Sequence, residues 1–252
     1  MRLPDSLLEL PAEEGARLIA LGLIQALWSA RLRLGTGDPE ALHDFRVALR
    51  RLRTALRTYR PQVRESAPRR SLRRLRRLAR ATRDSRDLEV HIAWSRAQAP
   101  RLTPRQQVGV EWLLDRMERR RRESDAALGR RVARDFERTI APLERRLSSY
   151  HATIGTEPLR RSLAVAAVVG AAIGRLAGDL EAALGHVHGV RDEEPAHRAR
   201  IAAKRLRYAL EPIAGLVAGV GPLIERLRTL QDELGDLHDS HVFVAELARA
   251  VE

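Results

Sequence analysis

The sequence predicts an all-α protein built as two pseudo-symmetric antiparallel helical bundles. Three observations carry this prediction: long stretches of helical periodicity, prolines that separate those stretches, and an internal repeat. No segment shows sustained alternation with a period of two. Only nine of the 252 residues are Phe, Trp or Tyr, so strands are not expected.

Prolines mark the expected helix starts. A proline in the first helical turn is tolerated, because the amide hydrogen that it lacks would have no partner there. Asp38 and Thr103 each precede such a proline and are expected to act as N-caps. Pro142 and Pro212 fall inside expected helices and should kink or break them. The seven predicted helices span residues 11–34, 39–60, 68–98, 104–149, 158–185, 195–218 and 222–250.

The internal repeat centres on one basic segment that occurs twice. Residues 43–57 read HDFRVALRRLRTALR, and residues 197–211 read HRARIAAKRLRYALE, at a constant offset of 154. The next helix also matches, since 75–90 aligns with 227–242 at an offset of 152. We therefore expect two repeats, 1–150 and 151–252, that together form one domain.

The second repeat is expected to be one helix short. Helix 104–149 has no counterpart after 222–250. A bundle that lacks one helix leaves an apolar face uncovered. We expect the long helix itself, or a second subunit, to cover that face.

The repeated helix separates its basic and apolar residues. At about 100° per residue, Phe45, Leu49 and Leu52 share one side. A different side carries His43, Arg46, Arg50, Arg53 and Arg57, within about 80° of one another. The following helix adds a second basic stripe of Arg73, Arg76, Arg77 and Arg80. The second repeat reproduces the first stripe with His197, Arg200, Lys204 and Arg207.

An ordinary solvated helix face is the alternative explanation of these stripes. Exposed helices usually alternate cations with carboxylates four residues apart, and these stripes contain almost none. The stripes also recur at matching positions in two repeats whose other surface residues differ. Both features favour a binding face for an anion.

The overall charge agrees with an anionic partner. The formal net charge is +13, and 45 of the 46 basic residues are arginine, with Lys204 as the only lysine. The arginine fork binds phosphate oxygens in pairs, whereas lysine offers a point charge. Nucleic acid, polyphosphate and an anionic membrane surface are the candidate partners.

Several classes of protein are disfavoured. Without cysteine there are no disulfides and no thiolate chemistry. The longest apolar stretches, 18–30 and 163–174, fall short of the roughly 20 residues that span a bilayer. We expect a soluble, cytoplasmic protein without a signal peptide. We find no nucleophile motif, P-loop or acidic metal cluster, so neither catalysis nor a cofactor is expected.

Some polar residues keep two interpretations. Asp84, Asp87, Asp236 and Asp239 either orient arginine side chains or form ordinary surface ion pairs. His238 and His241 have a spacing that permits metal ligation. Arg86 stands opposite His238 in the first repeat, so no metal site is assigned.

The motifs resemble those of the CHAD domain, the conserved histidine α-helical domain. The resemblance rests on H-x-x-R-x-x-x-R-R-L-R at 43–53, R-I-A-A-K-R-L-R-Y-A-L-E at 200–211 and L-G-D-L-H-D at 234–239. It implies two pseudo-symmetric helical bundles that bind inorganic polyphosphate along a basic surface or pore, with targeting to polyphosphate granules. Many family members carry a CYTH-type triphosphatase domain, for which 252 residues leave no room. A stand-alone, non-catalytic binder is therefore expected.

Two other functions stay open. A nucleic-acid-binding protein shares the same electrostatics, although single strands are normally read on aromatic platforms and none lies on the arginine side of 39–60. A polyphosphate hydrolase is the enzyme alternative, and it lacks candidate catalytic groups.

Overall fold

The computed structural model describes residues 3–34, 38, 40–149, 163–189 and 192–251, with side chains other than those of 83–87, 90, 125–131, 133 and 238–251. The chain is all-helical, and within the described ranges there is no strand, only an isolated bridge between Pro11 and Ala164. The α-helices are α1 (Ala12–Arg33), α2 (Ala41–Thr58), α3 (Arg60–Val63), α4 (Arg69–Ala81), α5 (Arg83–Gln98), α6 (Pro104–Ser148), α7 (Val165–Leu184), α8 (Glu193–Leu210) and α9 (Val220–Val251). Three 3-10 helices are also present: η1 (Asp5–Glu9), η2 (Ala99–Arg101) and η3 (Glu211–Ile213).

Most helix starts lie within two residues of the predicted prolines, and one cap is confirmed directly. The predicted start at 158 is an exception, because α7 begins at Val165 and residue 158 lies outside the described residues. Thr103 and Gln106 form a capping box at the start of α6, where the Thr103 N–H donates to Gln106 Oε1 at 3.0 Å. The Asp38 carboxylate accepts the backbone N–H of Glu40 at 2.9 Å, just before α2. Asp38 thus supports the turn that leads into the helix.

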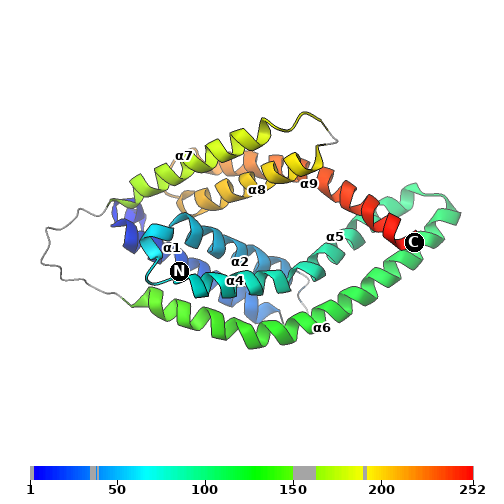
Figure 1. The fold of residues 1–252 in the computed structure, drawn as a ribbon, viewed down its shortest axis with the longest axis horizontal. Helices are drawn as coiled ribbons and strands as arrows, with labels where there is room; N and C mark the ends of the chain where they lie inside the picture. The colour runs from blue at the N-terminus through cyan, green and yellow to red at the C-terminus, as the bar shows by residue number, and fades with distance from the viewer. Residues whose placement is uncertain (1–2, 35–37, 39, 150–162, 190–191, 252) are drawn as a thin grey trace, which may run out of the picture.

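The predicted helix 68–98 is wrong as a single element, because it divides at Thr82. The Thr82 hydroxyl and N–H both reach the Ala79 carbonyl, at 2.9 and 3.3 Å. These local bonds replace the helical pattern at the end of α4. Helix α5 then leaves in a new direction to pair with α6 (Figure 1).

The two internal prolines behave differently. Helix α6 continues through Pro142, so a break there is wrong. Ile140, Leu143 and Leu147 are fully buried on both sides of that proline, and their packing offsets the lost hydrogen bond. Helix α8 does end before Pro212, which lies in η3.

One continuous core draws on both halves of the chain. Helix α1 packs against α2, α6 and α7, and α8 packs against α2, α7 and α9. The cluster includes Ile19 of α1, Leu52 of α2, Phe136 of α6 and Leu206 of α8. It therefore fixes the relative positions of the helices that carry the basic residues.

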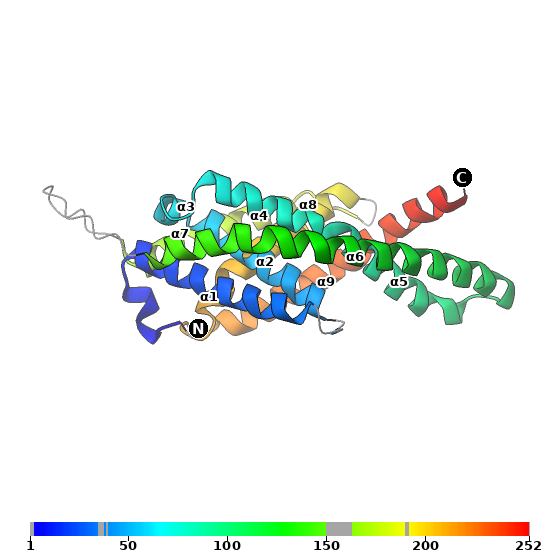
Figure 2. The same ribbon diagram turned by 90° about the horizontal axis from the view of Figure 1, so that it is seen from below.

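Helix α6 packs chiefly on α1, α4 and α5. It runs along the first half of the chain, and together with α5 it extends beyond the other helices (Figures 1 and 2). A small separate cluster of Leu88, Ile92 and Met117 holds this extension together. The long helix thus completes the first half of the chain.

Candidate anion-binding face

Helix α2 lies between α4 and α8 (Figure 1). Its apolar side carries Phe45, Leu49 and Leu52, each no more than 1% exposed, and they point into the core. Arg50 and Arg53 on another side are half-buried, and Arg57 is exposed. The division of the helix into an apolar and a basic side agrees with the expectation from helical spacing.

Arginines from three helices meet beside α2. Burial lowers the pKa of Arg53, and the charges of Arg57, Arg76, Arg50 and Arg80 lower it further. Burial likewise lowers the pKa of Arg57, followed by the charges of Arg205 and Arg76. The α2–α4 cationic face is therefore defined by Arg50, Arg53, Arg57, Arg76, Arg80 and Arg205.

Helix α4 extends this face along its length. Arg73 and Arg77 are exposed on α4 beside Arg76. Arg73 and Arg80 lie three and four residues from Arg76, so all three share one side of the helix. Arginines one helical turn apart in this stripe are separated by about 5–6 Å along the helix axis.

Arg46 has a structural contact at the edge of the face. Its guanidinium donates to the Thr82 carbonyl, at the point where α4 gives way to α5. This bond ties α2 to the end of α4 and satisfies an acceptor that the helix terminus leaves open. His43 lies one turn earlier on α2 and is half-buried.

The basic residues of α8 do not all join the α2–α4 cationic face. Arg207 donates to Gln231 Oε1 at 3.1 Å and to Glu211 Oε1 at 2.9 Å, and its guanidinium lies 4.7 Å from the centre of the Tyr208 ring. Only 13% of its side chain is exposed. Arg207 therefore faces α9 and is already paired with a carboxylate.

The other predicted residues of α8 are also half-buried. The guanidinium of Arg200 packs against Gly235 of α9, where an added Cβ would lie 3.4 Å from it. His197 and Lys204 are half-buried. Asp236 is exposed on α9, whereas the side chains of Asp84, Asp87, Asp239, His238 and His241 lie outside those that the structure describes.

Arg205 is the residue that sequence reasoning missed. Helical projection places it about 100° from Lys204, away from the predicted stripe. In the structure it is exposed on α8, and its charge acts on Arg57 of α2. The sequence contains no signal for this role, because it depends on the packing of α8 beside α2.

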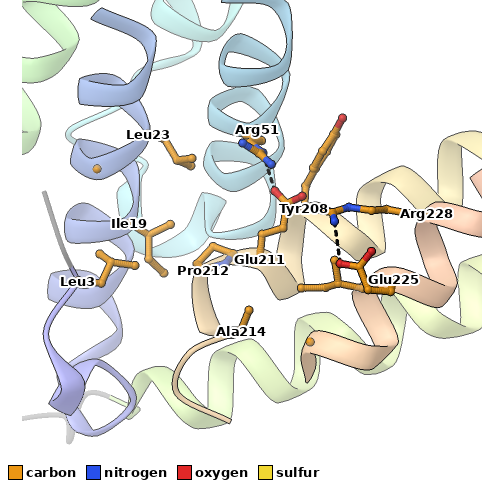
Figure 3. Close-up of a pocket in the computed structure, with 13 residues that line it drawn as sticks. Leu3, Ile19, Leu23, Arg51, Tyr208, Glu211, Pro212, Ala214, Glu225 and Arg228 are labelled. Atoms are coloured by element: carbon orange, nitrogen blue, oxygen red, sulfur yellow. Dashed lines mark hydrogen bonds and ion pairs between the residues drawn. The ribbon is translucent and has the colours of Figure 1, made fainter. Parts of the chain in front are cut away.

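A pocket of about 470 Å³ opens between α1, α2 and the α8–α9 connection (Figure 3). Ile19 and Leu23 form part of its apolar wall. Its charged side chains form two ion pairs. Arg51 Nε lies 2.5 Å from Glu211 Oε2, and Arg228 lies 2.7 Å from Glu225. Each arginine in this pocket thus faces a carboxylate.

The α2–α4 cationic face can hold oxyanions. Like charges that crowd together oppose folding, and a bound anion relieves that repulsion. Arginine forks can grip phosphate oxygens in pairs. Among the side chains that the structure describes, no group of three His, Asp or Glu residues gathers as a metal ion would require. No helix within the described ranges is long and apolar enough to cross a bilayer.

The described residues form an all-helical fold in which arginines of α2, α4 and α8 make up one cationic face. The family model for the CHAD domain matches residues 19–248. The chain belongs to the CHAD domain family.

Solved structures share this fold. The crystal structure of the CHAD domain from the plant Ricinus communis matches with a TM-score of 0.74 and 24% identity, covering 96% of this chain and 81% of that chain. PptA from Streptomyces chartreusis matches with a TM-score of 0.72 and 16% identity, covering 96% and 87%. Comparison with curated proteins gives no match.

Proposed function

We propose that this protein binds inorganic polyphosphate without catalysis, through the α2–α4 cationic face. The environment of Arg53 is the observation that carries the proposal, because four neighbouring arginines act on one half-buried guanidinium. A flexible chain of phosphates can neutralise all of them at once. The CHAD family is generally associated with polyphosphate, which agrees with this chemistry.

The proposal includes the architecture and the cellular setting. The repeat in the sequence pairs α1 with α7, α2 with α8, and α4–α5 with α9. We infer two pseudo-symmetric bundles from this pairing. We also infer that the protein acts in the cytoplasm, in association with polyphosphate granules.

The surroundings of the face favour polyphosphate over single-stranded nucleic acid. Phe45 of α2 and Tyr59, which follows α2, are buried in the core. Trp28 contacts Phe136 in an edge-on arrangement at 4.7 Å, within the core. Base stacking needs exposed aromatic rings beside the cations, whereas a phosphate chain does not.

A competition experiment tests the function and its site together. Long-chain polyphosphate, duplex DNA and single-stranded RNA are compared at physiological salt by fluorescence anisotropy. We expect polyphosphate to bind tightest, and the variant R53Q/R57Q/R76Q to lose at least ten-fold in affinity, because three forks of the face are removed.

The matched control is R105Q/R120Q/R134Q, which removes the same charge from exposed positions of α6. Equal losses in both variants would contradict the site. Nucleic acid that binds as tightly as polyphosphate would overturn the function in favour of a nucleic-acid-binding protein. Release of phosphate from polyphosphate with added Mg²⁺ would instead indicate a hydrolase.

A further inference from the structure

The second repeat keeps cations opposite Arg50 and Arg53, namely Lys204 and Arg207, but it replaces arginines at the end of α2 and along α4 with carboxylates. The offset of 154 places Glu211 opposite Arg57, and the offset of 152 places Glu225 and Asp232 opposite Arg73 and Arg80. The five positions Arg57, Arg73, Arg76, Arg77 and Arg80 carry a charge of +5. Their counterparts are Glu211, Glu225, Arg228, Thr229 and Asp232, with one cation, three carboxylates and a charge of −2. We call these counterparts the second-repeat face.

Contacts show what the carboxylates do. Glu211 lies 2.5 Å from Arg51 and 2.9 Å from Arg207, so one carboxylate pairs with two arginines from different repeats. Glu225 pairs with Arg228 at 2.7 Å. Arg51, Arg207 and Arg228 are therefore paired from within the protein, as Figure 3 illustrates for Arg51 and Arg228.

The two faces are alike in how they are assembled. The charge of Arg205 on α8 acts on Arg57 of the first repeat, and Arg51, its counterpart in the repeat, pairs with Glu211 at the end of α8. An arginine of each repeat thus acts on the other repeat. The neighbouring group differs: the charge of Arg205 acts on the cation Arg57, whereas Arg51 pairs with a carboxylate at the matching position.

Burial makes the pairing at Glu211 hard to displace. The side chain of Glu211 is 16% exposed and that of Arg207 is 13% exposed. A polyanion that approaches would have to separate these pairs before it could bind their arginines. Partly buried pairs are screened less than exposed ones, so the pairing persists at physiological salt.

We propose that Glu211 and Glu225 determine specificity by excluding polyphosphate from the second-repeat face, so that each chain takes polyphosphate on one face only. This inference rests on the proposed function. It concerns where the polyanion binds and how many short chains one protein holds.

Calorimetric titration with tripolyphosphate tests the exclusion, because that ligand is too short to span both repeats. We expect one site in the wild-type protein and a second, weaker site in E211Q/E225Q. The control E111Q/E137Q changes the net charge equally at exposed positions of α6 and should keep one site. Two equivalent sites in the wild type, or a single site in a folded E211Q/E225Q, would overturn the proposal.

A second comparison needs no change at the glutamates. Arg76 and Arg228 occupy matching positions in the two repeats. R76Q should lower the affinity of the wild-type site several-fold, and R228Q should leave it within two-fold. Equal losses of affinity in R76Q and R228Q would overturn the exclusion but would not contradict the proposed function. Absence of binding by the wild-type protein would instead contradict the proposed function.

Discussion

Arg53 shows why this face suits an anion. Its pKa lies below the usual arginine value, first because of burial and then because of four neighbouring arginines. A base with a lowered pKa in the folded state opposes folding at every pH below that pKa, and the penalty disappears only when the pH rises through it. Arginine stays charged throughout the physiological range. The repulsion is therefore relieved by a bound anion and not by titration.

Tyr59 provides a test at the scale of one residue. Burial raises the pKa of its hydroxyl from 10.0 to about 12, and the side chain is 2% exposed. Stability that depends on the neutral hydroxyl is complete below pH 10 and is lost as the pH rises towards 12. Two pKa units correspond to about 2.7 kcal/mol.

We expect Tyr59→Phe to remove this loss. At pH 7 the change in unfolding free energy should stay within about 1 kcal/mol, because the hydroxyl makes no hydrogen bond within the described structure. Urea denaturation from pH 8 to 12 measures the effect. If the unfolding free energies of the wild type and the variant fall in parallel from pH 8 to 12, Tyr59 is not the group that causes the loss of stability.

At the scale of elements, two glycines should respond in opposite ways to alanine. An added Cβ at Gly15 of α1 would lie 2.1 Å from Val165 Cγ2 of α7, whereas Gly109 of α6 has nothing within 4 Å. The helices are fixed at this point, since the Ala12 N–H donates to the Leu163 carbonyl and the Val165 N–H to the Leu10 carbonyl, both at 2.9 Å.

We expect Gly15→Ala to destabilise the protein by about 1–3 kcal/mol through overpacking. Gly109→Ala should stabilise it by about 0.5–1 kcal/mol, because alanine is the better helix former in an open position. Thermal denaturation of the two variants compares them directly. Equal effects would mean that α1 and α7 are not packed closely at this point.

Most helices could be predicted from the sequence, but the break between α4 and α5 could not. Proline and helical spacing are local, and they place the starts of α1, α2 and α6 within two residues. The break at Thr82 has no proline or glycine beside it, and arginine continues on both sides. It depends on the pairing of α5 with α6 and on the bond from Arg46, which are tertiary contacts.

At the scale of the whole molecule, polyphosphate should stabilise the fold. A ligand at 100 times its Kd adds about 2.7 kcal/mol, which corresponds to a rise in Tm of roughly 5–10 °C for a chain of this size. Linked phosphates engage several arginines at once, so orthophosphate at the same total phosphate should have a much smaller effect. Thermal denaturation with each ligand, at low and high salt, measures this difference.

Salt provides the control for that experiment. Screening weakens contacts with exposed cations, so the shift caused by polyphosphate should shrink as the salt concentration rises. Equal stabilisation by orthophosphate would contradict multivalent binding. A shift that does not depend on salt would contradict a binding face made of arginines.

The sequence by itself determined the helical class, most helix starts and the basic and apolar sides of α2, because each follows from residues within a few turns of one another. Tertiary structure decided which arginines meet. Arg205 joins Arg57 because α8 packs beside α2, and Arg207 turns to Gln231 and Glu211 because α9 lies on its other side. Helical spacing fixes where a side chain points on its own helix, but only the packing of helices brings it against a neighbouring cation or carboxylate.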